Sequence, residues 1–194
     1  MISTEKFIIK PSWKKIKSKG NRAVITIDPG MAFGTGHHFT TLYCIKELQK
    51  YSNKKGRFLD IGCGSGILSI VASMCGMKYI VAIDNSKDAV EISKKNFKSN
   101  CCGKKAVFKH IDIEKFCSSE KFTTIACNLY DTLILRYSEK IMSLMENESI
   151  IILSGIRIFK ADEIKRAFKG CVILNDEISS EREWYGITLK KYLY

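Results

Sequence analysis

Two acidic residues and a glycine-rich loop form the part of this sequence best suited to bind a small ligand. Asp60 follows a short apolar run, Gly62, Gly64 and Gly66 come directly after it, and Asp84 closes a second apolar run. Glycines let a ligand approach the backbone, and a helix that follows such a loop offers unpaired N–H groups. An acid at the end of the second run can bind the two hydroxyls of a ribose. The pattern therefore predicts a site for a nucleotide-like ligand.

The spacing of the glycines narrows the kind of nucleotide. Dinucleotide sites use GxGxxG, and here the sixth position is Ile67. The loop suits a ligand without a pyrophosphate: Asp60 can pair with an ammonium, Asp84 with a ribose, and Asp112, after the next strand, with an adenine amine. Ammonium, ribose and adenine together describe S-adenosylmethionine. Another nucleotide, or a tight turn that binds nothing, stays open as an alternative.

Asn128 and Tyr130, after the next buried run, are the candidate catalytic residues. The side-chain oxygen of Asn128 can accept a hydrogen bond from an amine. The ring of Tyr130 can contact a methylammonium group. The alternatives are a helix cap for Asn128 and plain packing for Tyr130. We interpret His37 and His38 as residues that cap or cover the loop leading into the helix at Thr40, with a catalytic base as the alternative, and Cys127 as a small core residue.

These residues need strands and helices that bring them to one edge of a sheet. Apolar periodicity and turn residues predict strands over 23–27, 58–61, 79–83, 106–108, 122–127, 148–153, 171–178 and 185–193. The same signals predict helices over 42–51, after Gly66 as far as Gly76, after a Ser86 cap, over 133–145 and over 159–169. We expect Ser154 and Gly155 to end the sixth of these strands, and Trp13 and Trp184 to be packing residues.

Alternation of strands and helices predicts an α/β fold with a doubly wound, seven-stranded, mostly parallel sheet, of the Rossmann-like kind. The last two strands have no helix between them, so we expect an antiparallel hairpin at the sheet edge. Residues 1–22 look like a lead-in strand and linker. The remainder, 23–194, is expected to be one domain.

Composition bounds the class of protein. The chain has 194 residues, of which 45% are hydrophobic and 27% charged, as in a soluble globular domain. No apolar run approaches the ~20 residues that span a bilayer, and no secretory signal is present, so we expect a cytoplasmic protein. Eight cysteines show no metal-ligand spacing. The net charge of +12 suits RNA, ribosomes or acidic partners, or simply a lysine-rich solvated surface.

Beyond these single residues, longer segments resemble the ribosomal protein L11 methyltransferase family. The matching segments are PSW at 11–13, DPGMAFGTGHHFTT at 28–41, LDIGCGSGILSI at 59–70, AID at 82–84, CNLY at 127–130, LSGI at 153–156 and EWYGITLKK at 183–191. The resemblance implies a class I methyltransferase fold that uses S-adenosylmethionine to methylate protein amines. It implies cofactor contacts at Thr41, Gly62, Asp84 and Asn128, and a loop that covers the cofactor with Phe33, Thr35 and Gly36.

The resemblance supports the predicted reaction more strongly than it identifies the substrate. Members of this family carry an N-terminal substrate-recognition domain, and few residues precede the segment 28–41 here. The electron-transfer flavoprotein lysine methyltransferase, which lacks that domain, is also similar to the catalytic part. We therefore expect an enzyme that methylates a protein lysine or N-terminal amine, with a ribosomal protein as one candidate. RNA or a small-molecule amine as substrate, and a non-catalytic S-adenosylmethionine-binding module, stay open.

Overall fold

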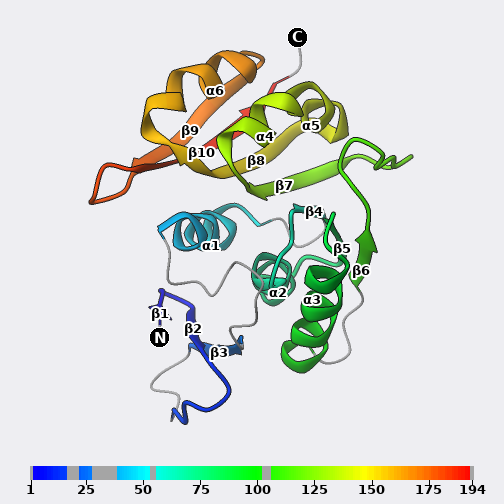
Figure 1. Ribbon diagram of the computed structural model, residues 1–194, viewed down its shortest axis with the longest axis vertical. Coiled ribbons are helices and arrows are strands. Elements are labelled where there is room, and N and C mark those ends of the chain that lie inside the picture. Colours follow the sequence, from blue (N-terminus) through cyan, green and yellow to red (C-terminus); the bar gives the residue numbers. More distant parts are fainter. Residues whose placement is uncertain (1, 17–21, 28–38, 53–55, 102–105, 193–194) are drawn as a thin grey trace.

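A seven-stranded sheet in the order β6-β5-β4-β7-β8-β10-β9 runs through the molecule (Figure 1). The computed structural model describes residues 2–16, 22–27, 39–52, 56–101 and 106–192. The first five strands in that order are parallel, and β10 runs antiparallel to both β8 and β9. This confirms the predicted α/β class and the hairpin at the sheet edge. The strands are β4 (Arg57–Ile61), β5 (Tyr79–Asp84), β6 (Ala106–His110), β7 (Phe122–Asn128), β8 (Met145–Arg157), β9 (Cys171–Ile178) and β10 (Trp184–Lys191).

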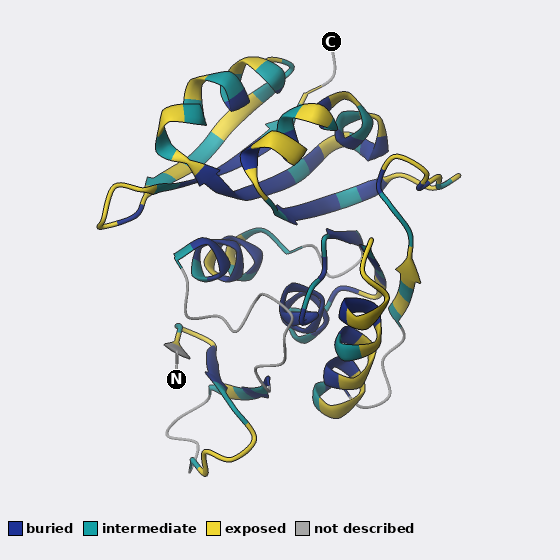
Figure 2. Cartoon of the chain, in the orientation of Figure 1, coloured by how far each residue is buried: buried dark blue, intermediate teal, exposed yellow. Residues whose placement is uncertain are grey.

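Helices cover both faces of the sheet and create two apolar cores (Figures 1 and 2). Side chains of β4 alternate between the two faces, as strand geometry requires. Phe58 packs with one set of helices, whereas Leu59 and Ile61 pack with the other. The first set is α1 (Phe39–Tyr51), α2 (Ile67–Met74) and α3 (Lys87–Asn100); the second is α4 (Asp131–Arg136), α5 (Ser138–Leu144) and α6 (Ala161–Ala167).

Local sequence signals set the ends of the helices beside the glycine loop. Ser86 caps α3, because its Oγ accepts a hydrogen bond from the Ala89 N–H at 3.3 Å. Gly76 follows the end of α2 with a φ of 98°, the left-handed conformation that favours glycine there. Both predictions are confirmed. The Ser86 cap therefore fixes the start of α3 just after Asp84, and Gly76 fixes the end of α2, the helix that follows the glycine loop.

Two predictions in the C-terminal half are wrong. The expected helix over 133–145 is divided at Tyr137, whose φ of −106° and ψ of 14° interrupt the helix. Beside this break the hydroxyl of Ser138 donates to the Leu135 carbonyl, a local bond that competes with helix continuation. Strand β8 does not end at residues 154 and 155 but continues to Arg157, with an irregular register opposite β10. Gly155, with a φ of 83°, bends the strand instead of ending it.

The N-terminal segment forms a small three-stranded sheet beside α1 and α2. It consists of β1 (Ile2–Ser3), β2 (Phe7–Lys10) and β3 (Ala23–Thr26). Strand β2 pairs with β3 in parallel, and its side chains Phe7 and Ile9 belong to the same core as α1. The domain boundary expected at residue 22 stays a prediction, although β2 and β3 pair across it. In the described part of the chain, no helix is long and apolar enough to cross a membrane.

Candidate active site

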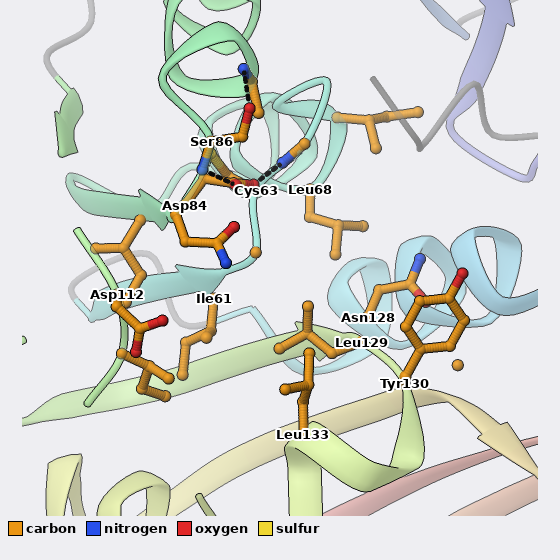
Figure 3. A pocket seen from close by; sticks show the side chains of 18 of the residues that line it. Ile61, Cys63, Leu68, Asp84, Ser86, Asp112, Asn128, Leu129, Tyr130 and Leu133 are labelled. Carbon is orange, nitrogen blue, oxygen red and sulfur yellow. Dashed lines mark hydrogen bonds between the residues drawn. The ribbon is translucent and has the colours of Figure 1, made fainter. Parts of the chain in front are cut away.

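A cavity of about 770 Å³ opens at the carboxyl ends of β4, β5 and β7 (Figure 3). Ligands of doubly wound sheets bind at this edge, where the strand order changes direction. After β4 the chain adds β5 and β6 on one side of β4 and then crosses to β7 on its other side. The strand order therefore changes direction at β4. The cavity brings together six of the predicted site residues, namely Gly62, Gly64, Asp84, Asp112, Asn128 and Tyr130.

Asp84 ends β5 with its carboxylate tied to the backbone on both sides. Its Oδ2 accepts a hydrogen bond from the Gly64 N–H at 3.0 Å, and its Oδ1 accepts one from the Ser86 N–H at 2.9 Å. These bonds orient the carboxylate toward the glycine loop and the start of α3. Each carboxylate oxygen has a second lone pair, so both can still accept from a ligand in the cavity. The arrangement suits a diol that presents two adjacent hydroxyl donors.

The glycine loop lies directly against the loop after β7. Gly62 and Gly64 have φ values of 73° and 52°, a conformation that glycine adopts without strain. A Cβ at Gly62 would come within 2.3 Å of the Leu129 Cδ2. The absence of a side chain at Gly62 therefore allows Leu129 to line the cavity and leaves the loop backbone accessible to a ligand.

Asp60 lies behind the glycine loop and is not among the residues that line the cavity. It is buried, and its Oδ2 accepts hydrogen bonds from the backbone N–H and the hydroxyl of Ser69, at 3.0 and 2.6 Å, in the first turn of α2. Burial raises the pKa of this carboxyl from 3.8 to about 7, against the opposing effect of the Ser69 hydrogen bonds. Asp60 thus fixes the helix that follows the loop; its pairing with an ammonium stays a prediction.

Asn128 and Thr41 connect the end of β7 to α1. The Asn128 Nδ2 donates to the Thr41 Oγ1 at 3.2 Å, and Thr41 is buried. The Asn128 Oδ1 is also buried and has no hydrogen-bond partner in the described part of the chain. A buried acceptor without a partner costs roughly 1–3 kcal/mol, so it points to a donor supplied by a ligand. Because the amide nitrogen is engaged with Thr41, the free group is the oxygen.

Two further predicted residues, Asp112 and Tyr130, lie at opposite sides of the cavity (Figure 3). Asp112 follows β6, and its Oδ1 accepts from the Glu114 N–H at 2.8 Å. Tyr130 precedes α4 and is 68% exposed, so its ring is not held by core packing. The three loop residues expected to cover a cofactor (Phe33, Thr35 and Gly36), together with His37 and His38, lie outside the described residues.

An ion pair supports the loop that carries Asn128 and Tyr130. Asp131 is buried, and its two carboxylate oxygens accept from the Arg157 Nε and Nη2, each at 2.8 Å. The Arg157 backbone N–H donates to the same carboxylate at 3.1 Å. The Arg157 guanidinium lowers the pKa of the Asp131 carboxyl, against the opposing effect of burial. This pair joins the start of α4 to the end of β8.

Sequence reasoning missed several residues of the site. A Cβ at Gly155 would lie 2.3 Å from the Leu129 carbonyl oxygen, so this glycine admits the loop after β7. Trp184 lines the cavity, so it is not only a packing residue. The prediction that Trp13 is a packing residue is wrong, because its side chain is 69% exposed. The LSGI segment was a usable signal for Gly155, since a Ser-Gly pair inside an apolar strand is typical of close backbone approach. Cys127 is buried as predicted, and burial raises its pKa well above the ordinary value, which keeps the thiol neutral.

The fold is that of the class I S-adenosylmethionine-dependent methyltransferases, and the cavity lies where that class binds its cofactor. The residues fit that cofactor: a tethered carboxylate suited to a ribose, a glycine loop open to a ligand, and a buried acceptor, the Asn128 Oδ1, that has no partner among the described residues. The chain belongs to the ribosomal protein L11 methyltransferase family, whose model matches residues 1–192.

Individual relatives agree with this assignment. The chain is 36% identical over 194 residues to the ribosomal protein L11 methyltransferase of Acetivibrio thermocellus, and 34% identical over 192 residues to that of Dictyoglomus turgidum. Each match covers 96% of this chain, but only 59% and 61% of those relatives' own lengths.

Solved structures show the same fold. The ribosomal protein L11 methylase of Lactobacillus delbrueckii subsp. bulgaricus superposes with a TM-score of 0.88 at 23% identity, over 98% of this chain and 97% of that one. The N-methyltransferase NodS of Bradyrhizobium japonicum in complex with S-adenosyl-L-homocysteine superposes with a TM-score of 0.63 at 13% identity, over 80% of this chain and 89% of that one. At these identities the likeness concerns the fold alone.

Proposed function

We propose that this chain is an S-adenosylmethionine-dependent N-methyltransferase that acts on a protein amine, either a lysine side chain or an N-terminus. The observation that carries the proposal is the buried Oδ1 of Asn128, an acceptor without a partner in the described residues, at the wall of the cavity. An amine is a donor of matching chemistry. The names of the relatives support a ribosomal protein as the substrate class.

Separate residues hold the parts of the cofactor in this proposal. Asp84 binds the ribose hydroxyls, Asp112 the adenine amine, and Gly62 and Gly64 the amino-acid part. Asp60, behind the loop, supplies negative charge toward the ammonium. The predicted cover formed by Phe33, Thr35 and Gly36 belongs to the same proposal. When bound, S-adenosylmethionine supplies a methyl group on a positively charged sulfur.

The work of the protein on the substrate is to deliver a neutral amine in the right direction. A free lysine has a pKa of about 10.4 and is mostly protonated at neutral pH. Apolar side chains at this end of the cavity, Leu129 and Leu133, disfavour the charged form and lower that pKa. The Asn128 Oδ1 then accepts an N–H of the neutral amine and directs its lone pair, and the ring of Tyr130 limits access of water. Reacting atoms need to approach to about 3 Å, so this alignment supplies much of the acceleration.

Labelling of a cell lysate with radioactive S-adenosylmethionine tests the proposal. The wild type should label a protein, whereas Asn128→Ala should lose most transfer and keep measurable affinity for S-adenosyl-L-homocysteine. Full activity of Asn128→Ala would remove Asn128 from the mechanism. Label in RNA or in a small-molecule amine would replace the protein substrate, and cofactor binding without transfer to any fraction would favour a non-catalytic module. Mass spectrometry of the labelled band identifies the substrate. Fractionation of the cells into cytoplasm and membranes tests the cytoplasmic location that we propose for the enzyme.

A further inference from the structure

Three apolar side chains stand exposed beside the amine end of the cavity. Tyr130 is 68% exposed, Phe159 is 67% exposed and Leu133 is 37% exposed. We call these three residues the rim. Tyr130 and Leu133 line the cavity itself, and Figure 3 shows them on the side of Asn128, away from Asp84 and Asp112. Grouped exposed apolar side chains mark surfaces that bind something.

Phe159 is connected to the cavity through Arg157. The Arg157 guanidinium lies 4.8 Å from the centre of the Phe159 ring and also holds Asp131, the residue after Tyr130. In the sheet Arg157 pairs with Trp184, which lines the cavity. The two aromatic side chains of the rim therefore stand at the same edge of the sheet, linked by an ion pair and a cation–π contact.

Three positively charged side chains next to the rim have acidic partners. Arg157 forms its ion pair with Asp131 at 2.8 Å, Lys160 pairs with Glu163 at 2.7 Å, and Arg136 pairs with Glu114 at 3.7 Å. A nucleic acid needs cations that are free to neutralise its phosphates. Because these three cations already contact acidic side chains, the exposed apolar rim fits an uncharged apolar side chain better than a phosphate backbone.

We propose that the rim binds the apolar side chain of a residue adjacent to the methylated amine in a polypeptide substrate. The inference rests on the proposed function and deepens it, because it names what the enzyme reads next to the amine. Phe159 does not line the cavity, so a small amine held inside the cavity has no use for it. A polypeptide passes over the rim while one of its amines enters the cavity.

Two synthetic peptides that differ only in the residue after a single lysine, phenylalanine or serine, test this inference. The wild type should show a KM about tenfold lower for the phenylalanine peptide, the effect of burying one aromatic side chain. Phe159→Ala should raise that KM about tenfold, with kcat and the affinity for S-adenosyl-L-homocysteine unchanged. Tyr79→Ala is the matched control. Tyr79 is 57% exposed and its ring contacts the Arg57 guanidinium, but it begins β5 and so lies at the amino ends of the parallel strands, opposite the cavity.

A third peptide, with norleucine in place of lysine before phenylalanine, reports binding without transfer. It should bind the wild type and Tyr79→Ala equally, and Phe159→Ala more weakly. Equal KM values for the two lysine peptides, or no effect of Phe159→Ala, would overturn the rim inference and leave the proposed function standing. If neither lysine peptide is methylated, the proposed function fails on these substrates, and the norleucine peptide alone decides about the rim. RNA binding that falls steeply with salt and is lost in Phe159→Ala would also overturn it.

Discussion

The side-chain amide of Asn128 donates a hydrogen bond to the hydroxyl oxygen of Thr41 at 3.2 Å and so joins the end of β7 to the first turn of α1. An asparagine side chain offers either its oxygen or its nitrogen, depending on how the amide is turned. The Thr41 contact engages the nitrogen and leaves the buried oxygen without a partner in the described residues. Thr41 therefore holds the Asn128 side chain with its oxygen free for a substrate.

Substitution of Thr41 should separate this positioning role from simple packing. Thr41→Val keeps the shape of the side chain but removes the acceptor, so we expect kcat to fall about tenfold, the effect of one lost hydrogen bond of ~1.4 kcal/mol. Thr41→Ser keeps the hydroxyl and should restore most of kcat. Steady-state kinetics on the labelled substrate measure this, with thermal unfolding as a control for folding. Equal kcat values for the valine and serine variants would contradict the role.

Asp84 should control affinity for the cofactor. Asp84→Asn removes the negative charge and one acceptor beside the proposed ribose site, and hydrogen bonds to charged groups contribute about 1.5–3 kcal/mol. We expect affinity for S-adenosyl-L-homocysteine to fall 10- to 100-fold in isothermal titration calorimetry. Asp162→Asn, an exposed acid in the first turn of α6, is the control and should bind normally. An unchanged affinity in Asp84→Asn would refute the ribose assignment.

Gly155 should be intolerant of any side chain. Gly155→Ala places a Cβ 2.3 Å from the Leu129 carbonyl oxygen in a backbone conformation with a φ of 83°. Left-handed backbone costs about 1–2 kcal/mol and forced overpacking about 1–3 kcal/mol, so the free energy of unfolding should fall by roughly 2–5 kcal/mol. Gly170→Ala is the control, because its Cβ would meet the Met142 Cε only at 3.7 Å. Urea denaturation compares the two, and equal stability would show that the loop after β7 can move aside.

The parts of the site that follow from the sequence are those decided by neighbouring residues. The glycine loop, the Ser86 cap and the position of Asp84 each depend on a turn or a strand end within a few residues. Asp84 is the last residue of β5 and opens to the cavity, whereas Asp60 is followed by Ile61 within β4. Both acids follow apolar residues of a strand, so the sequence alone does not distinguish a carboxylate that lines the cavity from one that binds the first turn of α2.

The parts that did not follow depend on contacts between distant residues. Arg157 and Asp131 are 26 positions apart, and no local pattern pairs them. Gly155 ended a strand in the prediction because Ser-Gly is a common turn signal; the strand continues because β10 pairs with β8 on both sides of it. Tertiary packing decided these two features. The break at Tyr137 is different, because it lies beside the local Ser138–Leu135 hydrogen bond, which the regular apolar pattern does not reveal.

Asp60 should make the stability of the unliganded protein depend on pH. Burial raises its folded-state pKa to about 7, above the value of 3.8 for a free side chain. Below about pH 4 the carboxyl is protonated in both states, and its contribution to stability is fully present. Between pH 4 and 7 the unfolded chain loses the proton while the folded protein keeps it, so the free energy of unfolding falls as pH rises. The total change is on the order of 4 kcal/mol and levels off above pH 7.

The variant Asp60→Asn isolates this effect, because an amide cannot ionise and its oxygen can still accept from Ser69. Urea unfolding of both proteins from pH 5 to 8 gives two stability curves. The difference between them should grow in favour of Asp60→Asn as pH rises to 7 and then stay constant, while Asp162→Asn should follow the wild type. Parallel curves for wild type and Asp60→Asn would mean that Asp60 is already ionised at pH 5 in the folded protein. In that case the Ser69 hydrogen bonds outweigh the burial, and a full negative charge stands behind the glycine loop before any cofactor binds.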